Sequence, residues 1–359
     1  MIGEVAHIAG ESVDGPRGAS PTPTSDRNDV ANLVLLCPNE HTEADSGRLD
    51  DPLYTEDFLL ARKASKEAWI RFVTGLDADR TTTVLRLSGD VRGSTSLISQ
   101  HDAASVTMTD ALRTPMYLPD PRGVGLTIDL AEIPDPGSQQ YWATCLRQVD
   151  EALERLRRFA QSDDSAGGST HMSVFAFALI PILVALGNGL DDTLGVDVYD
   201  RHRSTDSWHW NNDAEPVAFE YTIPDVGQAS EAALVINASG SIQPAELPNA
   251  ASDIPLILIK PSEGHTPGPL TFASRHTLDG FTSTVRRLFA DLETHKNIRH
   301  LHVFLAAPLS AAVNFGRVWP VDNAAPAMTI YHRTDNEYIP AVDLPRTLRE
   351  PTSPSTTEK

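Results

Sequence analysis

The sequence predicts two folded parts, a small α+β module over residues 1–76 and a larger α/β domain over residues 80–345. The main observation is a repeat within the second part. The apolar run HMSVFAFALIPILVALG at residues 171–187 recurs as HLHVFLAAPLSAAVNFG at residues 300–316. Each copy indicates a short buried strand, a break at a proline and an apolar helix that ends at glycine. The period is that of half a domain, too long for a solenoid repeat.

A constant offset of 129 residues relates the two copies. It pairs His171 with His300, Val174 with Val303, Phe175 with Phe304, Ala178 with Ala307 and Gly187 with Gly316. Amphipathic segments at residues 141–161 and 277–293 precede the copies and are predicted to be helices. Chance resemblance between two strand–helix units is the alternative. A membrane span is disfavoured, because the apolar run 174–186 has only 13 residues and contains Pro181.

Alternating strands and helices favour parallel sheets, so we expect two α/β halves with parallel strands. Such sheets bind ligands beyond the carboxyl ends of their strands. Two related halves facing one another would share one pocket of roughly two-fold symmetry. A pocket of that symmetry suits a two-fold or cyclic ligand.

Composition narrows the classes of partner. The formal net charge is −20, which disfavours nonspecific adhesion to nucleic acid, so any DNA contact must be local and assisted by a metal ion. With two cysteines, Cys37 and Cys145, no disulfide framework is indicated. The start, MIGEVAHIAGES, lacks the basic and apolar regions of a signal peptide, and we expect a cytoplasmic protein without a membrane partner. The polar, proline-rich segment 346–359 is expected to be a disordered tail.

The first module is expected to contain a strand in GEVAHI, a long loop, an apolar strand in NLVLLCP and then a helix or polar turn. A helical segment at residues 53–73 would link it to the next domain. Its chemistry-bearing residues are His7, Asn32 and His41, with a Gly-Pro-Arg loop at residues 15–17. Each residue alone has an ordinary structural explanation, since a histidine on a strand or an asparagine before one is usually structural.

In order and spacing, AHI, GPR and NLVLLCPNEH resemble the HNH endonucleases, which have a ββα-metal site. The resemblance implies that His7 is the general base that activates water, that Asn32 orients the loop carrying this base, and that His41 is a metal ligand. A divalent cation, which we expect to be Mg²⁺, would offset charge developing on the phosphate. Glu43 and Asp45 are both candidates to complete the coordination of the metal ion, and we predict Asp45 as the second metal ligand beside His41.

Three departures from the HNH pattern bear on activity. Ala6 stands where many members have an acidic ligand, and Glu40 stands where a second cysteine would follow Cys37. The start is also short, with no CxxC before the histidine. One cysteine cannot build a four-ligand zinc site, so no structural zinc is expected. A degenerate, inactive module is therefore the alternative to an active nuclease.

In the second domain, two strand-to-loop corners, VLRLSGD and LVINASGS, could bind anionic oxygens through hydroxyls and backbone N–H groups. An ordinary tight turn is the alternative at each. The basic and aromatic stretch 196–210 could bind phosphate through arginine and stack bases on tryptophan; the alternative, which the sequence slightly favours, is that the tryptophans are core residues on a strand. From this geometry of strand ends we predict ligand contacts at Ser88, Gly89, Arg92, Arg203, Trp208, Trp210, Ser239, Gly240, Lys260, Pro308 and Tyr331.

The segments SVFAFALIPILVALG, YDRHRSTDSWHW and HVFLAAPLSAAVNFGRVWP resemble the SAVED domain, which is similar to two fused CARF-like halves. An HNH module followed by SAVED resembles one effector class of the bacterial CBASS anti-phage system. The resemblance implies a cyclic di- or trinucleotide activator, double-stranded DNA as the substrate of the nuclease, and a homo-oligomer that assembles with ligand. We therefore predict a ligand-activated endonuclease. The alternative is a cyclic-nucleotide-binding protein with an inactive HNH module. A conventional nucleotide-using enzyme is disfavoured, because GxGxxG after a strand and GxxxxGK[ST] are absent.

Overall fold

The computed structural model describes residues 3–46, 54–74, 80–118, 125–160, 171–190, 195–202, 205–294, 297–319, 326–335 and 337–345. The chain divides into two compact units, Met1–Asp77 and Ala78–Lys359. In the described helices, none is long and apolar enough to cross a membrane.

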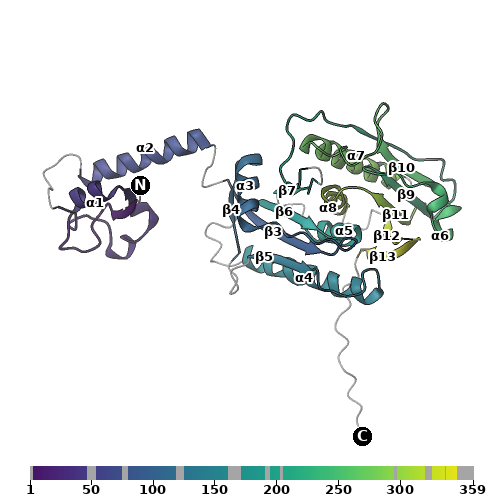
Figure 1. The fold of residues 1–359 in the computed structure, drawn as a ribbon, viewed down its shortest axis with the longest axis horizontal. Coiled ribbons are helices and arrows are strands. Elements are labelled where there is room, and N and C mark those ends of the chain that lie inside the picture. The colour runs from purple at the N-terminus through teal and green to yellow at the C-terminus, as the bar shows by residue number, and fades with distance from the viewer. Residues whose placement is uncertain are drawn as a thin grey trace, which may run out of the picture. The chain divides into compact units, whose positions relative to one another are not determined.

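The first unit is a ββα arrangement with a second, longer helix (Figure 1). Strands β1 and β2 pair antiparallel, with His7 opposite Leu33. The expected strands and helices are present, with the bounds β1 Glu4–His7, β2 Leu33–Leu36, α1 Pro38–Asp45 and α2 Glu56–Thr74. Short 3₁₀ turns at Thr24–Asp26 and Val30–Asn32 fill the connection between the strands.

Helix α1 begins where its sequence supplies a cap. The Cys37 sulfur accepts from the backbone N–H of Glu40, and the Glu40 carboxylate accepts from the backbone N–H of Cys37. Pro38 occupies the first turn, where its missing N–H costs no hydrogen bond. The CPNE segment therefore serves as a reciprocal helix cap in this chain.

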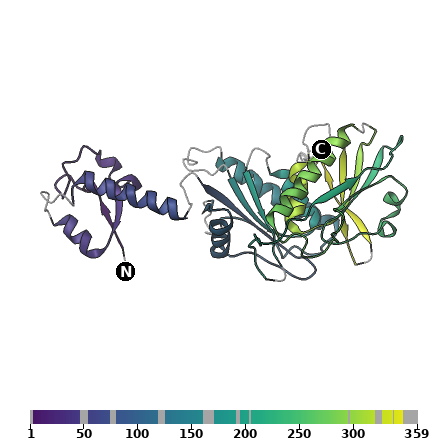
Figure 2. The ribbon, with the colours of Figure 1, turned by 90° about the horizontal axis from the view of Figure 1, so that it is seen from above.

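The second unit contains two sheets, one in each half (Figures 1 and 2). In the first, strands run in the order β4-β3-β6-β7, and all pairs are parallel. Strand β5 also pairs in parallel with β3, along the part of β3 that follows the residues paired with β4. The elements of this half are β3 Thr81–Gly89, α3 Gln100–Asp110, β4 Thr114–Met116, β5 Leu126–Leu130, α4 Gln139–Ala160, β6 His171–Phe177, α5 Ile180–Gly189 and β7 Gly195–Tyr199.

The second sheet has the order β13-β12-β11-β9-β10-β8, in which β12, β11, β9 and β10 are mutually parallel and the two edge strands are antiparallel. Its elements are β8 Phe219–Thr222, β9 Glu231–Asn237, a 3₁₀ turn at Pro244–Glu246, α6 Asn249–Ser252, β10 Leu256–Pro261, α7 Arg275–Thr294, β11 His300–Ala306, α8 Leu309–Val318, β12 Ala327–Arg333 and β13 Tyr338–Leu344.

The prediction of two similar parallel α/β halves is confirmed. The series β3, β5, α4, β6, α5, β7 of the first half is matched by β9, β10, α7, β11, α8, β12 of the second. The expected order had only two strands in each half. The structure adds the second and last strands of each series, which lie outside the repeated apolar run.

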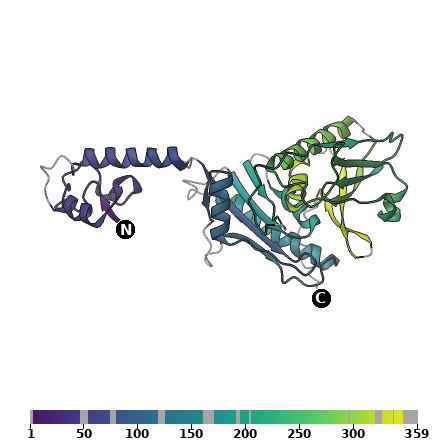
Figure 3. The ribbon, with the colours of Figure 1, turned by 45° about the horizontal axis from the view of Figure 1, so that its top comes forward.

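Helices α5 and α8 lie side by side between the two sheets (Figures 1 and 3), and each also contacts strands of the opposite half. Their crossing is reciprocal. A Cβ on Gly187 would lie 1.9 Å from the carbonyl oxygen of Val313, and one on Gly316 would lie 2.0 Å from that of Val184. These four residues are related by the same offset of 129. Glycine is required at both positions because the two backbones touch.

Candidate functional site

In the first unit, the structure holds His7 at the end of β1 in a defined orientation. Its Nε2 lies 2.9 Å from Oδ1 of Asn28. Since an amide oxygen only accepts, this bond assigns the proton to Nε2 and makes Nδ1 the basic nitrogen. Asn32 is buried, and its side chain accepts from the N–H of Ala9 at 2.8 Å and donates to the carbonyl of the same residue at 2.9 Å. Asn32 thus fixes the backbone that follows His7.

Arg17 of the Gly-Pro-Arg loop connects β1 to α1. Its guanidinium donates to the carbonyls of His7 at 3.0 Å, Ile8 at 2.8 Å and Ala44 at 2.5 Å, and it pairs with Asp45 at 3.3 Å. The side chain is only 5% exposed. One buried arginine therefore sets the distance between the strand carrying His7 and the helix carrying the predicted metal ligands.

His41 lies between two carboxylates. Its Nδ1 is 3.4 Å from Glu4 and its Nε2 is 3.8 Å from Asp45, one turn further along α1. Asp45 is at the same time engaged by Arg17. Within the described ranges, no three histidine, cysteine or acidic side chains are grouped so that they could hold a metal ion. Glu4 and Asp45 approach different nitrogens of the His41 ring, so among the described residues these three side chains do not converge on one divalent ion.

In the second unit, a cavity of about 1050 Å³ lies at the carboxyl ends of the parallel strands of both sheets. We call it the strand-end cavity. Loops following β3, β6, β7, β9, β11 and β12 all contribute to it. Its principal lining segments are residues 90–93, 177–180, 200–202, 239–242, 305–309 and 331–335. The position agrees with the general rule that open parallel sheets bind ligands at these ends.

Several residues predicted to contact ligand line this cavity: Arg92, Trp210, Ser239, Gly240, Pro308 and Tyr331. Others lie outside it. Ser88 is buried within β3, and a Cβ added to Gly89 would lie 3.2 Å from the Cβ of Ala178. Lys260 pairs with Glu220 of the neighbouring edge strand at 3.2 Å. Arg203 falls outside the described residues.

The structure buries most of the surface of the aromatic residues that were predicted to stack on bases. Trp208 is 7% exposed and packs edge-on against Phe175, so it belongs to the core. Trp210 is similarly buried and presents its ring to His202. One face of Tyr331 is already covered by Phe304, whose ring centroid is 4.5 Å away. Burial of apolar ring area stabilises the fold and leaves these rings little free face for a base.

The cavity is lined by charged and titratable side chains of both kinds: three arginines, three histidines and the three aspartates Asp90, Asp200 and Asp335. Arg92 is exposed, has a φ of 55°, and among the described residues has no hydrogen bond or ion pair. Arg201 and Arg333 also line the cavity. Burial lowers the pKa of His202, and burial together with the charge of Arg92 lowers that of His332, so both imidazoles are neutral at pH 7.

His202 carries the cavity's unsatisfied polar atom. Its Nε2 is buried and has no hydrogen-bond partner in the described part of the chain. Such an atom is stabilised when a ligand or water supplies the missing bond. His332 and Arg333 were not predicted from the sequence. The signal that could have found them is the similarity between VYDR at residues 198–201 and IYHR at residues 330–333.

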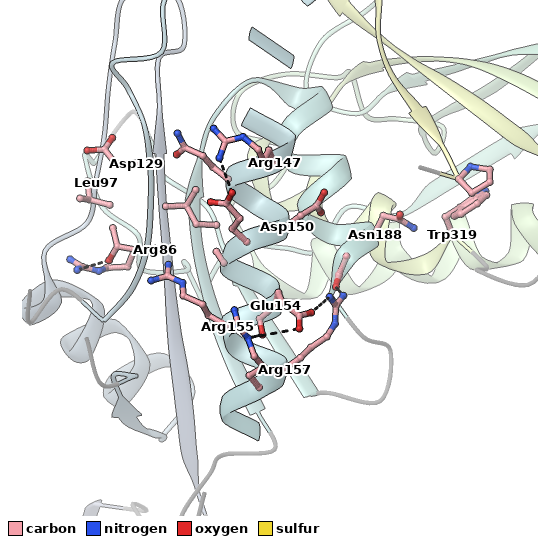
Figure 4. Close-up of a pocket in the computed structure, with 18 residues that line it drawn as sticks. Arg86, Leu97, Asp129, Arg147, Asp150, Glu154, Arg155, Arg157, Asn188 and Trp319 are labelled. Atoms are coloured by element: carbon pink, nitrogen blue, oxygen red, sulfur yellow. Dashed lines mark hydrogen bonds and ion pairs between the residues drawn. The ribbon is translucent and has the colours of Figure 1, made fainter. Parts of the chain in front are cut away.

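A second hollow, of about 1400 Å³, lies along α4 (Figure 4). Its charged side chains are engaged with one another: Arg147 pairs with Glu151 at 2.7 Å, and Arg157 pairs with Glu154 at 3.7 Å. Arg86 donates to a backbone carbonyl and to a threonine hydroxyl, and burial lowers its pKa. Because this hollow lies along a helix, away from the strand ends, and its cations are paired, the strand-end cavity is the better candidate site.

The chain is similar to three solved structures of receptors that contain a SAVED/CARF domain. A structure of an Acinetobacter baumannii Cap4 SAVED/CARF-domain receptor with the cyclic trinucleotide 3′3′3′-cAAA has a TM-score of 0.44 and 16% identity, covering 66% of this chain and 53% of that one. The same receptor with 2′3′3′-cAAA has a TM-score of 0.45 and 12% identity, covering 89% of this chain and 64% of that one. A Moraxella osloensis Cap4 SAVED/CARF-domain receptor has a TM-score of 0.39 and 16% identity, covering 61% of this chain and 47% of that one. This chain therefore spans less than two thirds of the length of these receptors.

No curated protein matches the sequence. The sequence model of SAVED, the SMODS-associated and fused to various effectors sensor domain, matches residues 153–344, which is more than half of the chain. That range contains the repeated strand–helix units and most of the strand-end cavity. The chain therefore belongs to the SAVED family.

Proposed function

We propose that the second unit is a sensor that binds a cyclic oligonucleotide, either a di- or a trinucleotide, in the strand-end cavity. The observation that carries the proposal is that the carboxyl ends of the parallel strands of two related sheets converge on one cavity, where three arginines and three histidines are among the lining residues. Arginine matches the geometry of phosphate oxygens, and a neutral imidazole can donate or accept a hydrogen bond. Membership of a family of sensor domains supports the same assignment.

We further propose that the first unit is an HNH-type endonuclease that cuts double-stranded DNA when the sensor is occupied, as an effector of CBASS-type anti-phage defence. Support comes from the positions of His7 and Asn32. The proton on Nε2 of His7 leaves Nδ1 to accept a proton from attacking water, and Asn32 keeps the adjoining backbone in place. A divalent ion would supply electrophilic stabilisation, but no catalytic step through it follows from the arrangement at His41.

The decisive experiment is plasmid digestion by the full chain with Mg²⁺, with and without 3′3′-cyclic diadenylate or 3′3′3′-cyclic triadenylate. We expect cutting only with ion and activator present. His7→Ala should slow cutting by roughly 10²–10⁴-fold, the usual contribution of a general base, while ligand binding is unchanged. His265→Ala is the matched control, because His265 is an exposed histidine of the other unit. Equal cutting by wild type and His7→Ala would contradict the assignment.

A cyclic-nucleotide-binding protein with an inactive HNH module is the second candidate. The specific observation in its favour is the incomplete ligand set around His41 among the described residues. Ligand binding without cutting under any tested divalent ion, including Mn²⁺, would favour this candidate.

We also propose that ligand acts by assembling copies of the chain. A chain of net charge −20 is repelled by DNA at long range, and cutting both strands simultaneously requires two sites on one duplex. Ligand drives assembly only if it binds the assembled form more tightly, and a hundredfold preference supplies about 2.7 kcal/mol per site. Light scattering with and without the two cyclic nucleotides tests this. Unchanged mass during active cutting would contradict it.

A further inference from the structure

The strand-end cavity contains a second repeat, which has a different offset from the first. VYDR at residues 198–201 matches IYHR at residues 330–333 with an offset of 132 residues. Tyrosine and arginine are identical in the two segments, and the first position is β-branched in both.

The two segments are equivalent in three dimensions. VYDR follows α5 and spans the end of β7, and IYHR follows α8 and ends β12; each of these strands pairs in parallel with the strand of the apolar repeat. Tyr199 stacks on Phe175 with ring centroids 4.5 Å apart, and Tyr331 stacks on Phe304 at the same distance. Phe175 and Phe304 are themselves matched residues of the first repeat. The arginines two residues after these tyrosines therefore occupy corresponding places in the two halves.

Arg201 and Arg333 also have matching surroundings. Both line the cavity. Arg201 pairs with Asp206, and Arg333 pairs with Glu246 at 2.6 Å. The guanidinium carbon of Arg201 lies 5.9 Å from the ring centroid of Phe177, and that of Arg333 lies 5.4 Å from the ring centroid of Tyr338.

The partners of the two arginines come from unrelated elements. Asp206 follows β7, whereas Glu246 is in the turn after β9; Phe177 ends β6, whereas Tyr338 begins β13. The loops have diverged, yet each arginine has a carboxylate and an aromatic ring beside it. This similarity points to a role for the guanidinium itself rather than for the surrounding loops.

Stability does not account for the similarity. The side chain of Asp206 is 76% exposed, and the side chain of Arg333 is 45% exposed. Ion pairs this accessible to water contribute little to folding, because solvent screens them. A guanidinium has five N–H donors, however, so one carboxylate can orient it while other donors remain for a phosphate.

We propose that Arg201 and Arg333 are a two-fold related pair of phosphate-binding residues, each contacting one phosphodiester of the cyclic oligonucleotide. The inference rests on the proposed sensor function and deepens it. The ligand must then present two phosphodiesters on opposite sides of its ring. Arg92 has no basic counterpart, since the corresponding corner of the second half is Ser239–Gly240–Ser241, so it acts on one side only.

The test measures the affinity of the full chain for 3′3′-cyclic diadenylate and 3′3′3′-cyclic triadenylate by calorimetry. Arg201→Gln and Arg333→Gln should each weaken binding by a similar factor, roughly 10- to 100-fold, the usual value of a charge-assisted hydrogen bond. The double variant should show about the product of the two factors, because the arginines act on separate phosphates. Arg201→Lys and Arg333→Lys keep the charge and should recover part of the affinity.

Arg147→Gln is the matched control, because Arg147 is also a surface arginine paired with a glutamate but lies on α4, outside the strand-end cavity. It should leave affinity unchanged. A loss confined to one of the two arginines, or to neither, would overturn the pairing while the sensor function stood. Failure of the wild type to bind either nucleotide would instead overturn the sensor function, and the pairing with it. The lysine variants can still form the ion pairs with Asp206 and Glu246, so their affinities would test the proposal even if the glutamine variants failed to fold.

Discussion

The two units of this chain position their functional residues by different means. In the first, buried arginine and asparagine side chains bond directly to backbone carbonyls, and few large apolar residues are buried. In the second, one continuous apolar core runs through both halves, including the crossing of α5 and α8. Hydrogen bonds are directional, whereas apolar packing depends on shape and volume. The first unit should therefore be sensitive to loss of a donor, and the second to a change in volume.

The largest effect should follow from adding volume at the helix crossing. Gly187→Ala and Gly316→Ala each place a methyl group about 2 Å from a carbonyl oxygen of the other helix. Backbone cannot yield as a side chain can, so we expect each change to destabilise the second unit by about 3 kcal/mol. Chemical denaturation followed by tryptophan fluorescence measures this. Gly268→Ala, whose new methyl group would be 3.9 Å from its nearest neighbour, is the control and should change stability by less than about 0.5 kcal/mol.

A somewhat smaller effect should follow from Arg17→Lys in the first unit. Lysine keeps the charge but cannot reach the carbonyls of His7, Ile8 and Ala44 together, so we expect a loss of about 2 kcal/mol. Hydrogen exchange of the amides in β1 and α1 reports the change locally. Arg62→Lys on the exposed surface of α2 should leave these rates unaltered. Unchanged exchange in Arg17→Lys would show that the first unit does not depend on its polar contacts.

Acidification should weaken the second unit through its half-buried imidazoles, His202 and His332. The pKa values of His202 and His332 are lowered by burial, so the unfolded chain takes up protons near pH 6.5 while the folded chain does so only at lower pH. Above the unfolded-state pKa both states are neutral, so these histidines do not reduce the free energy of unfolding. As pH falls from there towards the lowered folded-state pKa values, protonation of the unfolded chain reduces the free energy of unfolding. His332→Gln should flatten this dependence between pH 7.5 and 5, and His265→Gln should not. An equally steep profile in His332→Gln would exclude His332 as a source.

The smallest effect is expected at Lys260, which forms a half-exposed ion pair with Glu220 on the edge of the second sheet. Lys260→Ala should change the free energy of unfolding by no more than about 0.5 kcal/mol. It should also leave cyclic nucleotide affinity unchanged, because the residue lies outside the strand-end cavity. A loss of affinity would show that Lys260 contributes to ligand binding, as the sequence predicted.

The sequence was sufficient to predict the pairing of the two halves, because volume constrains that interface. Gly187 and Gly316 recur at a constant offset since each must admit a backbone. The strand-end location of the cavity also followed from the order of strands and helices. The second repeat was missed because the offset changes from 129 to 132 between the two matched segments, so that a search at one spacing passes over Arg333.

Which side chains face the cavity could not be predicted from local sequence. Ser88 and Trp208 lie near a strand end and in an aromatic stretch, as cavity residues do, but the packing of the whole sheet puts both in the core. The carboxylates that pair with Arg201 and Arg333 come from loops of different length and position. Only tertiary structure brings those groups together.

The reciprocal contact of α5 with α8 has the form of an isologous interface, in which the same patch serves both partners. In separate chains, such an interface requires identical surfaces, so each change appears twice. Joining the halves in one chain removes that requirement, and the high effective concentration of the second half maintains the pairing while the sequences diverge. One half can then acquire Arg92 and the other Tyr338 without duplicating either. Under the proposed sensor function, this symmetric scaffold would distinguish the two sides of an asymmetric cyclic ligand.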